Sequence, residues 1–218
     1  MNAGFLITLE GGEGVGKSTQ VRRLVARLEA AGRRALATRE PGGSAKAEAI
    51  RGLLLSGAVA PFGPAAEALL FAAARVDHLD RLIRPALAQG TIVVSDRFID
   101  STRVYQGIDR RVEPRFLVAL ETVTVGATRP DLTIILDLPS AVGLARAAAR
   151  RAPSAIPDRF EREALAFHDG LRRGFLTIAA AEPDRCAVVD AEASADEAAE
   201  RIWRVVETRL LTPRSSAP

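Results

Sequence analysis

A glycine-rich segment between an apolar run and an amphipathic stretch carries residue types suited to binding phosphate. Residues 11–18 read GGEGVGKS and match the pattern G-x-x-x-x-G-K-[ST]. In such a turn backbone N–H groups face phosphate oxygens, Lys17 reaches the β- and γ-phosphates, and the Ser18 hydroxyl binds Mg²⁺. A glycine turn needed only for close packing of a strand on a helix is the alternative interpretation. We expect ATP to bind along Gly11, Gly12, Glu13, Gly14, Val15, Gly16, Lys17, Ser18 and Thr19.

The rest of the chain narrows the class of nucleotide-binding protein. A GTPase of the usual kind needs a D-x-x-G switch and an N-K-x-D motif that reads guanine. No D-x-x-G occurs in the chain, and the only asparagine is Asn2. The sequence therefore favours a kinase or an ATPase.

An acidic and a basic residue, Asp96 and Arg97, follow directly after the apolar run TIVVS. At the carboxyl end of a strand an Asp can order Mg²⁺ or its water, and an Arg can clamp a phosphate through its two-pronged guanidinium. A surface ion pair at the end of a strand is the alternative, but the segments TREPGG at 38–43 and STRVYQG at 101–107 favour a functional site. We therefore expect Lys17, Asp96 and Arg97 to be catalytic, and Ser18 and Asp96 to be the metal ligands.

Several motifs occur in a fixed order along the chain. They are the phosphate-binding turn with Glu13 inside it, TREPGG at 38–43, FAAAR at 71–75, DRF at 96–98, STRVYQG at 101–107, RPDL at 129–132, DRFE at 158–161 and VDA at 189–191. In this combination the chain resembles bacterial thymidylate kinases of the P-loop nucleoside monophosphate kinase group, over about residues 4–208. The resemblance implies Mg²⁺-dependent transfer of phosphate from ATP to dTMP, giving dTDP for dTTP biosynthesis, by a homodimer.

The resemblance also implies an acceptor site for dTMP. Phe71 would stack on the thymine ring, and Arg75, one helical turn later on the same face, would donate to a thymine carbonyl. Taken without the resemblance, Phe71 is a core aromatic residue. Thr102 would bind the base edge, and Tyr105 would pack under the deoxyribose and disfavour a 2′-hydroxyl.

The remaining acceptor-site residues follow from the same motifs. Arg97, Arg39 and Arg51 would hold the acceptor phosphate, although Arg51 also fits a solvated helix face. The full set of acceptor-site residues is Arg39, Glu40, Pro41, Arg51, Phe71, Arg75, Arg97, Ser101, Thr102, Tyr105 and Gln106.

A basic segment at residues 145–163 predicts a mobile lid. It combines two prolines with Arg146, Arg150, Arg151 and Arg159, and it shows no apolar periodicity before Phe160. Phosphoryl transfer needs cations near the moving group. In the family that the chain resembles, an arginine of either the turn or the lid supplies one. Because the turn contains no arginine here, the resemblance implies that the lid supplies it. A solvated basic loop is the alternative. Our candidates for the catalytic arginine are Arg150 first, then Arg151 and Arg159.

The elements that must position these residues alternate between apolar runs and amphipathic stretches. Apolar runs rich in β-branched residues predict strands at 5–10, 35–39, 91–95, 132–138 and 186–190. Helical patterns occupy the stretch after residue 16 and about 44–56, 64–88, 114–125, 139–149, 161–181 and 194–211. Strands that alternate with helices predict an α/β fold, here the three-layer P-loop fold with a five-stranded parallel sheet flanked by helices. Its ligands should bind beyond the carboxyl ends of the strands.

Composition and length predict the domain organisation, the location and the partners of the protein. We expect one domain over residues 1–211, with a lid at about 147–160 and a disordered tail at 212–218. No apolar run approaches a membrane span and no signal sequence is apparent, which predicts a cytoplasmic protein with no membrane partner. The basic pI of 9.7 comes with a net charge of only +3 spread along the chain, so we expect no nucleic-acid partner.

Two rival functions stay open at this point. A related kinase acting on another nucleotide or nucleoside would keep the phosphate-binding turn and the lid. An ATPase bound to nucleic acid would show hydrolysis stimulated by DNA or RNA without a nucleotide acceptor.

Overall fold

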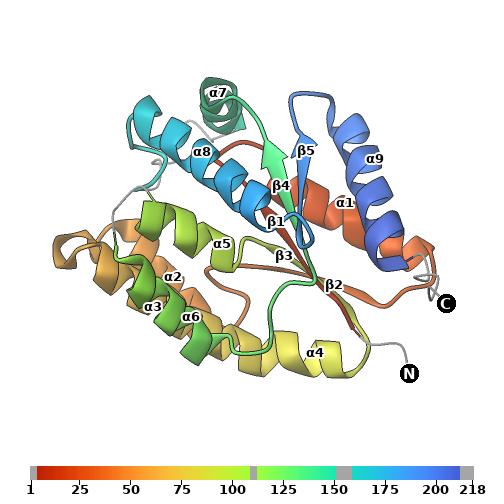
Figure 1. Ribbon diagram of the computed structural model, residues 1–218, viewed down its shortest axis with the longest axis horizontal. Coiled ribbons are helices and arrows are strands. Elements are labelled where there is room, and N and C mark those ends of the chain that lie inside the picture. Colours follow the sequence, from red (N-terminus) through yellow and green to blue (C-terminus); the bar gives the residue numbers. More distant parts are fainter. Residues whose placement is uncertain (1–3, 109–111, 151–158, 212–218) are drawn as a thin grey trace.

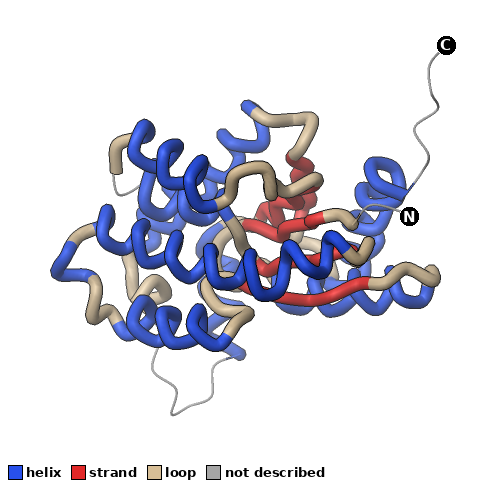
Figure 2. Tube along the Cα trace, turned by 90° about the horizontal axis from the view of Figure 1, so that it is seen from below, coloured by secondary structure: helices blue, strands red, loops and turns tan. Residues whose placement is uncertain are grey.

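A five-stranded parallel sheet forms the centre of the protein, whose computed structural model describes residues 4–108, 112–150 and 159–211. Its strands lie in the order β2-β3-β1-β4-β5. Their bounds are β1 (Leu6–Glu10), β2 (Ala35–Arg39), β3 (Ile92–Asp96), β4 (Leu132–Asp137) and β5 (Cys186–Asp190). Helices enclose this sheet on both faces (Figures 1 and 2). The predicted three-layer α/β fold is therefore confirmed.

The helices occupy nearly the predicted stretches of the chain. They are α1 (Lys17–Ala30), α2 (Ala45–Ser56), α3 (Pro64–His78), α4 (Arg84–Ala88), α5 (Ile99–Thr102), α6 (Pro114–Thr124), α7 (Ser140–Arg150), α8 (Leu165–Ala181) and α9 (Ala195–Val206). Short π-helical segments, Leu79–Ile83, Arg103–Ile108 and Glu207–Leu211, and a 3₁₀ turn, Ala60–Phe62, extend or connect them. None of the described helices is long and apolar enough to cross a membrane.

Apolar side chains on both faces of the sheet bind the helices to it. On β1, Ile7 and Leu9 are buried in a cluster with α1 and α9. Leu6 points to the opposite face, where it packs with Leu79 and Phe98. Because neighbouring residues of a strand face opposite sides, a run that is apolar throughout requires a helical layer on each side, and the structure provides both.

Several element boundaries differ from those expected. The stretch at 64–88 is one helical run made of α3, a π-helical segment and α4, since the i→i+4 ladder loosens at Leu79–Ile83. The chain around Glu161 forms a turn, and α8 begins only at Leu165. The short α5 and the π-helical segment after it carry no apolar periodicity, so the sequence did not predict them as helix.

The carboxyl ends of the strands place the candidate residues at one edge of the sheet. β1 leads into the glycine-rich turn and then α1, and β3 ends at Asp96. β2 ends at Arg39, which is paired in register with Asp96. Residues more than eighty positions apart in the sequence thereby meet at this edge.

Candidate active site

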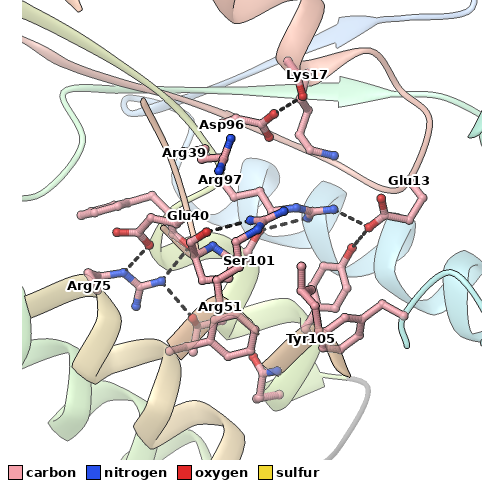
Figure 3. Close-up of a pocket in the computed structure, with 18 of the residues that line it drawn as sticks. Glu13, Lys17, Arg39, Glu40, Arg51, Arg75, Asp96, Arg97, Ser101 and Tyr105 are labelled. Atoms are coloured by element: carbon pink, nitrogen blue, oxygen red, sulfur yellow. Dashed lines mark hydrogen bonds and ion pairs between the residues drawn. The ribbon is translucent and has the colours of Figure 1, made fainter. Parts of the chain in front are cut away.

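A cavity of about 300 Å³ opens at the carboxyl edge of β1, β2 and β3. Figure 3 shows Lys17 and Asp96 on one side of this cavity, Arg75 on the opposite side, and Arg97 between them. The predicted residues that line it are Glu13, Gly14, Gly16, Lys17, Ser18, Arg39, Glu40, Pro41, Arg51, Phe71, Arg75, Asp96, Arg97, Ser101, Thr102, Tyr105, Gln106 and Arg150. Both halves of the predicted site, the phosphate-binding turn and the acceptor motifs, therefore face the same space.

The phosphate-binding turn adopts backbone conformations that require glycine. Gly14 and Gly16 have φ values of 70° and 95°, in the left-handed region, and α1 begins directly after Gly16. A Cβ atom on Gly14 would lie 1.8 Å from the carbonyl oxygen of Gly143 in α7, so the two backbones pack without a side chain between them. Val15 anchors the turn in the core cluster of α1. The turn therefore presents the start of α1, with its free N–H groups, to the cavity.

Lys17 is held at the base of this turn. Its Nζ donates hydrogen bonds to the carbonyl oxygens of Gly11 at 3.1 Å and Gly12 at 2.6 Å. Burial and the neighbouring Arg97 lower the pKa of the Lys17 ammonium to about 8. Gly11, Gly12 and Val15 line a separate small cavity behind the turn, and Thr19 stands in the first turn of α1, with its N–H donating to Gly16.

Ser18 and Asp96, the predicted metal ligands, lie next to each other. The Ser18 hydroxyl donates to Asp96 Oδ2 at 2.5 Å. The described residues contain no cluster of three or more His, Cys, Asp or Glu side chains able to hold a metal by themselves. A hydroxyl beside a single carboxylate nevertheless fits Mg²⁺, which takes oxygen ligands, keeps several waters and shares substrate phosphates.

Arg97 occupies the centre of the cavity. Its guanidinium pairs with Glu13 at 2.5 Å and donates to the Gly11 carbonyl and the Ser101 hydroxyl, each at 3.2 Å. It also lies over the Tyr105 ring, 5.0 Å from the centroid. Burial alone would raise the pKa of the Glu13 carboxyl, but the charges of Arg97 and Lys17 and the hydrogen bond from Tyr105 lower it to about 2. Glu13 is therefore an anion under all ordinary conditions.

Arg75 is fixed at the other end of the cavity by a buried ion pair. Its Nε donates to Glu40 Oε2 at 2.7 Å, and its Nη2 donates to the Phe98 carbonyl and the Thr102 hydroxyl, each at 3.1 Å. His78 is fully buried behind this pair, within hydrogen-bond distance of Glu40. The planar guanidinium is thus held rigidly at the cavity wall, as recognition of a flat ring edge requires.

Aromatic rings form the apolar wall beside Arg75. The Phe71 ring centroid lies 6.5 Å from that of Phe160, and Tyr105 packs edge-on against Phe160 at 5.4 Å. Phe71 is half-buried and lines the cavity, so it is not sealed inside the core. Gln106 also lines the cavity, and its buried amide has no hydrogen-bond partner among the described residues. An aromatic wall with a free amide nearby can take a planar ligand that has polar edges.

The other two acceptor-phosphate candidates, Arg39 and Arg51, also line the cavity. Arg39 pairs with Glu48 at 2.9 Å, and Arg51 donates to the Pro41 carbonyl at 2.7 Å. Arg51 is turned into the cavity and is not the solvated helix face that the sequence left open.

The lid arginines take different positions. Arg150 ends α7 and lines the cavity, with its Nε donating to the Arg146 carbonyl at 3.3 Å. Arg159 pairs with Glu67 of α3, which is almost fully buried, and does not line the cavity. Arg151 and most of the predicted lid, 151–158, lie outside the described residues. Residues 147–150 of the predicted lid belong to α7.

Glu10 is a site residue that the sequence reasoning missed. It ends β1, is fully buried, and accepts hydrogen bonds from the Phe98 N–H and the Ser101 hydroxyl. The sequence feature that could have identified Glu10 is a single acidic residue at the end of an apolar strand. The cavity-lining Leu55, Phe98 and Phe160 were also missed, because each reads as an ordinary core residue in the sequence.

The two histidines, the single cysteine and Asp137 do not line the cavity. His168 and Cys186 are buried, as is His78, so neither histidine faces solvent. Asp137, at the end of β4, accepts two hydrogen bonds from Arg172 of α8, at 2.7 and 2.9 Å.

Comparison with known proteins agrees with this geometry. Residues 9–202 match the family model for thymidylate kinase. The chain is 60% identical over 211 residues to the thymidylate kinase of Rhodopseudomonas palustris strain TIE-1, covering 96% of this chain and 91% of that one. It is 54% identical over 210 residues to the thymidylate kinase of Caulobacter vibrioides, covering 96% and 99%.

A solved structure is similar in fold as well. The crystal structure of thymidylate kinase from Ehrlichia chaffeensis superposes with a TM-score of 0.75 at 28% identity, covering 94% of this chain and 99% of that one. The chain therefore belongs to the thymidylate kinase family.

Proposed function

We propose that this thymidylate kinase family member transfers the γ-phosphoryl group of ATP to dTMP, giving ADP and dTDP, with Mg²⁺ bound beside the transferred phosphate. One observation carries the proposal: the phosphate-binding turn and the aromatic wall beside Arg75 line the same cavity of about 300 Å³. The turn suits a triphosphate and the wall suits a base, so the cavity offers places for a donor and an acceptor.

The acceptor would bind with its base against Phe71 and its phosphate toward Arg97. Arg75 then presents its guanidinium to the ring edge, since Glu40 and Thr102 hold it at the cavity wall. Tyr105 packs beside Arg97, and its ring would lie under the deoxyribose and disfavour a 2′-hydroxyl. These contacts favour a deoxyribonucleotide with a pyrimidine base.

Positioning and charge neutralisation would carry the reaction. An oxygen of the acceptor phosphate is already anionic, so the transfer needs no strong general base. Lys17 and Arg97 place two cations beside the phosphates, and the low local dielectric of a buried site strengthens their effect. Bound Mg²⁺, held by Ser18 and Asp96, would neutralise charge on the donor phosphates.

Arg150 is our candidate for the arginine that neutralises charge on the moving phosphoryl group. It lines the cavity from the end of α7, whereas Arg159 is engaged with Glu67. Arg151 follows Arg150 directly in the chain and remains the second candidate.

We also propose that the protein is a cytoplasmic homodimer, as the family resemblance implied. Exposed apolar side chains support an interface on one group of helices. Leu53 of α2, Leu69 of α3, and Val118 and Val123 of α6 are each at least half exposed. Because α3 contacts both α2 and α6, these side chains belong to neighbouring elements.

A panel of nucleoside monophosphates tests the function. The purified protein is given ATP and Mg²⁺ with dTMP, dUMP, dCMP, UMP or AMP, and the formation of ADP and of each diphosphate is measured. We expect dTMP to give the highest kcat/KM. A preference for dCMP, UMP or AMP would refute the choice of acceptor, and ATP hydrolysis that needs DNA or RNA but no nucleotide acceptor would refute the reaction itself.

A further inference from the structure

Glu10 joins the end of β1 to the segment that follows β3. Its Oε1 accepts a hydrogen bond from the Phe98 N–H at 2.7 Å, and its Oε2 accepts one from the Ser101 hydroxyl at 2.6 Å. We propose that Glu10 is a positioning residue that holds Arg97 in the orientation needed to bind the phosphate of the acceptor nucleotide. The inference rests on the role proposed above for Arg97.

The first link acts on the backbone of Arg97. With φ at 71°, Arg97 is the only non-glycine residue of the described chain in the left-handed region. A residue with a side chain keeps such a conformation only when its surroundings enforce it. The Arg97 N–H donates to the Leu9 carbonyl at 3.0 Å, and the next N–H, of Phe98, donates to Glu10. The end of β1 thus fixes the peptide groups on both sides of the Arg97 Cα atom.

The second link acts on the side chain of Arg97. The Ser101 hydroxyl donates its hydrogen to Glu10, which leaves its oxygen free to accept from Arg97 Nη1 at 3.2 Å. An ionised carboxylate only accepts hydrogen bonds, so Glu10 in its charged form fixes the direction of the Ser101 hydroxyl. The serine oxygen therefore faces the guanidinium, and the orientation of the guanidinium depends on the charge state of a residue that it does not touch.

The charge of Glu10 is also directed at the active site. The other buried carboxylate nearby, Asp100, is paired on both oxygens with Arg185, at 2.7 and 3.0 Å. Glu10 has no such ion pair among the described residues, and its charge interacts with those of Asp100, Arg97 and Lys17. Burying a carboxylate without a close cationic partner destabilises the folded protein. Such a buried charge is typically kept only where a functional site needs it.

Glu10→Gln tests the inference because glutamine keeps the shape but reverses one hydrogen bond. The glutamine amide N–H would donate to the Ser101 oxygen, which then competes with Arg97 for the same lone pairs. We expect the affinity for dTMP, measured by isothermal titration calorimetry at pH 8, to fall by about tenfold or more. The affinity for thymidine, which lacks the phosphate, should change by less than about twofold. The affinity of the Glu10→Gln variant for ATP should equal that of the wild type.

Thr8→Val is the matched control. Thr8 lies two residues before Glu10 on the same face of β1, is fully buried, and pairs with the Thr133 hydroxyl at 2.8 Å without touching Arg97. This variant removes a buried polar contact from the same strand and should leave the ratio of dTMP to thymidine affinity unchanged.

The outcomes separate the inference from the proposed function. Equal losses of dTMP and thymidine affinity in Glu10→Gln, or a loss of ATP affinity as large as that of dTMP, would show a general structural role and overturn the inference. Unchanged dTMP affinity would also overturn it. A wild-type protein that does not phosphorylate dTMP would count against the proposed function, whatever the variant shows.

Discussion

Arg97 and Glu13 form an ion pair 2.5 Å long at the centre of the cavity, between the residue assigned to the acceptor phosphate and the phosphate-binding turn. The pair links the two halves of the site directly. An acceptor phosphate that binds Arg97 must share the guanidinium with Glu13 or displace the Glu13 carboxylate from it. Acceptor binding would therefore change the electrostatic surroundings of the phosphate-binding turn.

Replacing Arg97 with lysine keeps the charge but removes the planar fork. Lysine cannot bind a phosphate through two parallel hydrogen bonds while also reaching Glu13 and Ser101. We expect Arg97→Lys to lower kcat/KM for dTMP by roughly a hundredfold. Steady-state kinetics measure this, with Arg173→Lys at an exposed position of α8 as the control. Activity within a few-fold of the wild type would show that charge alone suffices at this position.

Phe71 should contribute to acceptor binding more than to stability, because it is half-buried and lines the cavity. We expect Phe71→Ala to raise the KM for dTMP by about tenfold through the lost stacking surface, with the KM for ATP nearly unchanged. Phe62→Ala is the control, since Phe62 is 77% exposed in the 3₁₀ turn. If both KM values rise together, Phe71 supports the fold and does not bind the base.

Arg150→Ala tests the origin of the transition-state cation. We expect kcat to fall by more than about tenfold, equivalent to about 1.4 kcal/mol, while substrate binding changes little. Arg151→Ala should be measured in parallel, again with Arg173→Ala as the control. If no lid arginine lowers kcat by that amount, the lid does not supply the catalytic charge.

Arg159 should act mainly on stability. It pairs with Glu67, whose carboxylate is only 1% exposed, so Arg159→Ala leaves a buried charge without its partner. We expect the free energy of unfolding to fall by about 3 kcal/mol, measured by urea denaturation. The double variant Arg159→Ala with Glu67→Gln should recover part of that loss. A stable Arg159→Ala protein with a large loss of kcat would instead place Arg159 among the catalytic residues.

The stability of the protein should depend on pH through Glu10. Burial, and then the charge of Asp100, raise the pKa of Glu10 from 4.5 to about 7, against the opposing effects of Ser101 and Arg97. Between these values the unfolded chain releases the proton that the folded protein retains, so the contribution of Glu10 to stability falls as the pH rises through 7.

Glu10→Gln removes this titration. The stability of the variant relative to the wild type should therefore increase between about pH 5 and pH 8. Urea denaturation of both proteins at the two pH values measures the difference. Thr8→Val is the control: it keeps Glu10, so its stability relative to the wild type should be the same at both pH values. A stability difference that is the same at both pH values would show that Glu10 is ionised in the folded protein throughout.

Features that depend on neighbouring residues in the sequence could be predicted from it. The strands could be read from runs that are apolar on both faces, and the turn at residues 11–18 from glycines followed by Lys17 and Ser18. The partners of the buried charges could not. Arg75 pairs with Glu40, thirty-five positions away, and Arg159, in a turn, pairs with Glu67 of α3. Such pairs depend on how the elements pack, which no local pattern records.

The burial of Glu10 also could not be predicted from the sequence. A glutamate at the end of an apolar strand looks like the solvated end of that strand. Only the return of the chain after β3 to the end of β1 reveals that it is enclosed, with Phe98 and Ser101 as its donors.

The contact between Gly14 and Gly143 joins the phosphate-binding turn to α7, the helix that ends at Arg150. With backbone resting on backbone, there is no side chain whose rotation could absorb a small displacement. A shift of the turn by a fraction of an ångström must therefore tilt α7, and a helix of eleven residues carries that tilt to its far end. We therefore expect a displacement of the turn at Gly14 to move Arg150, at the opposite end of α7.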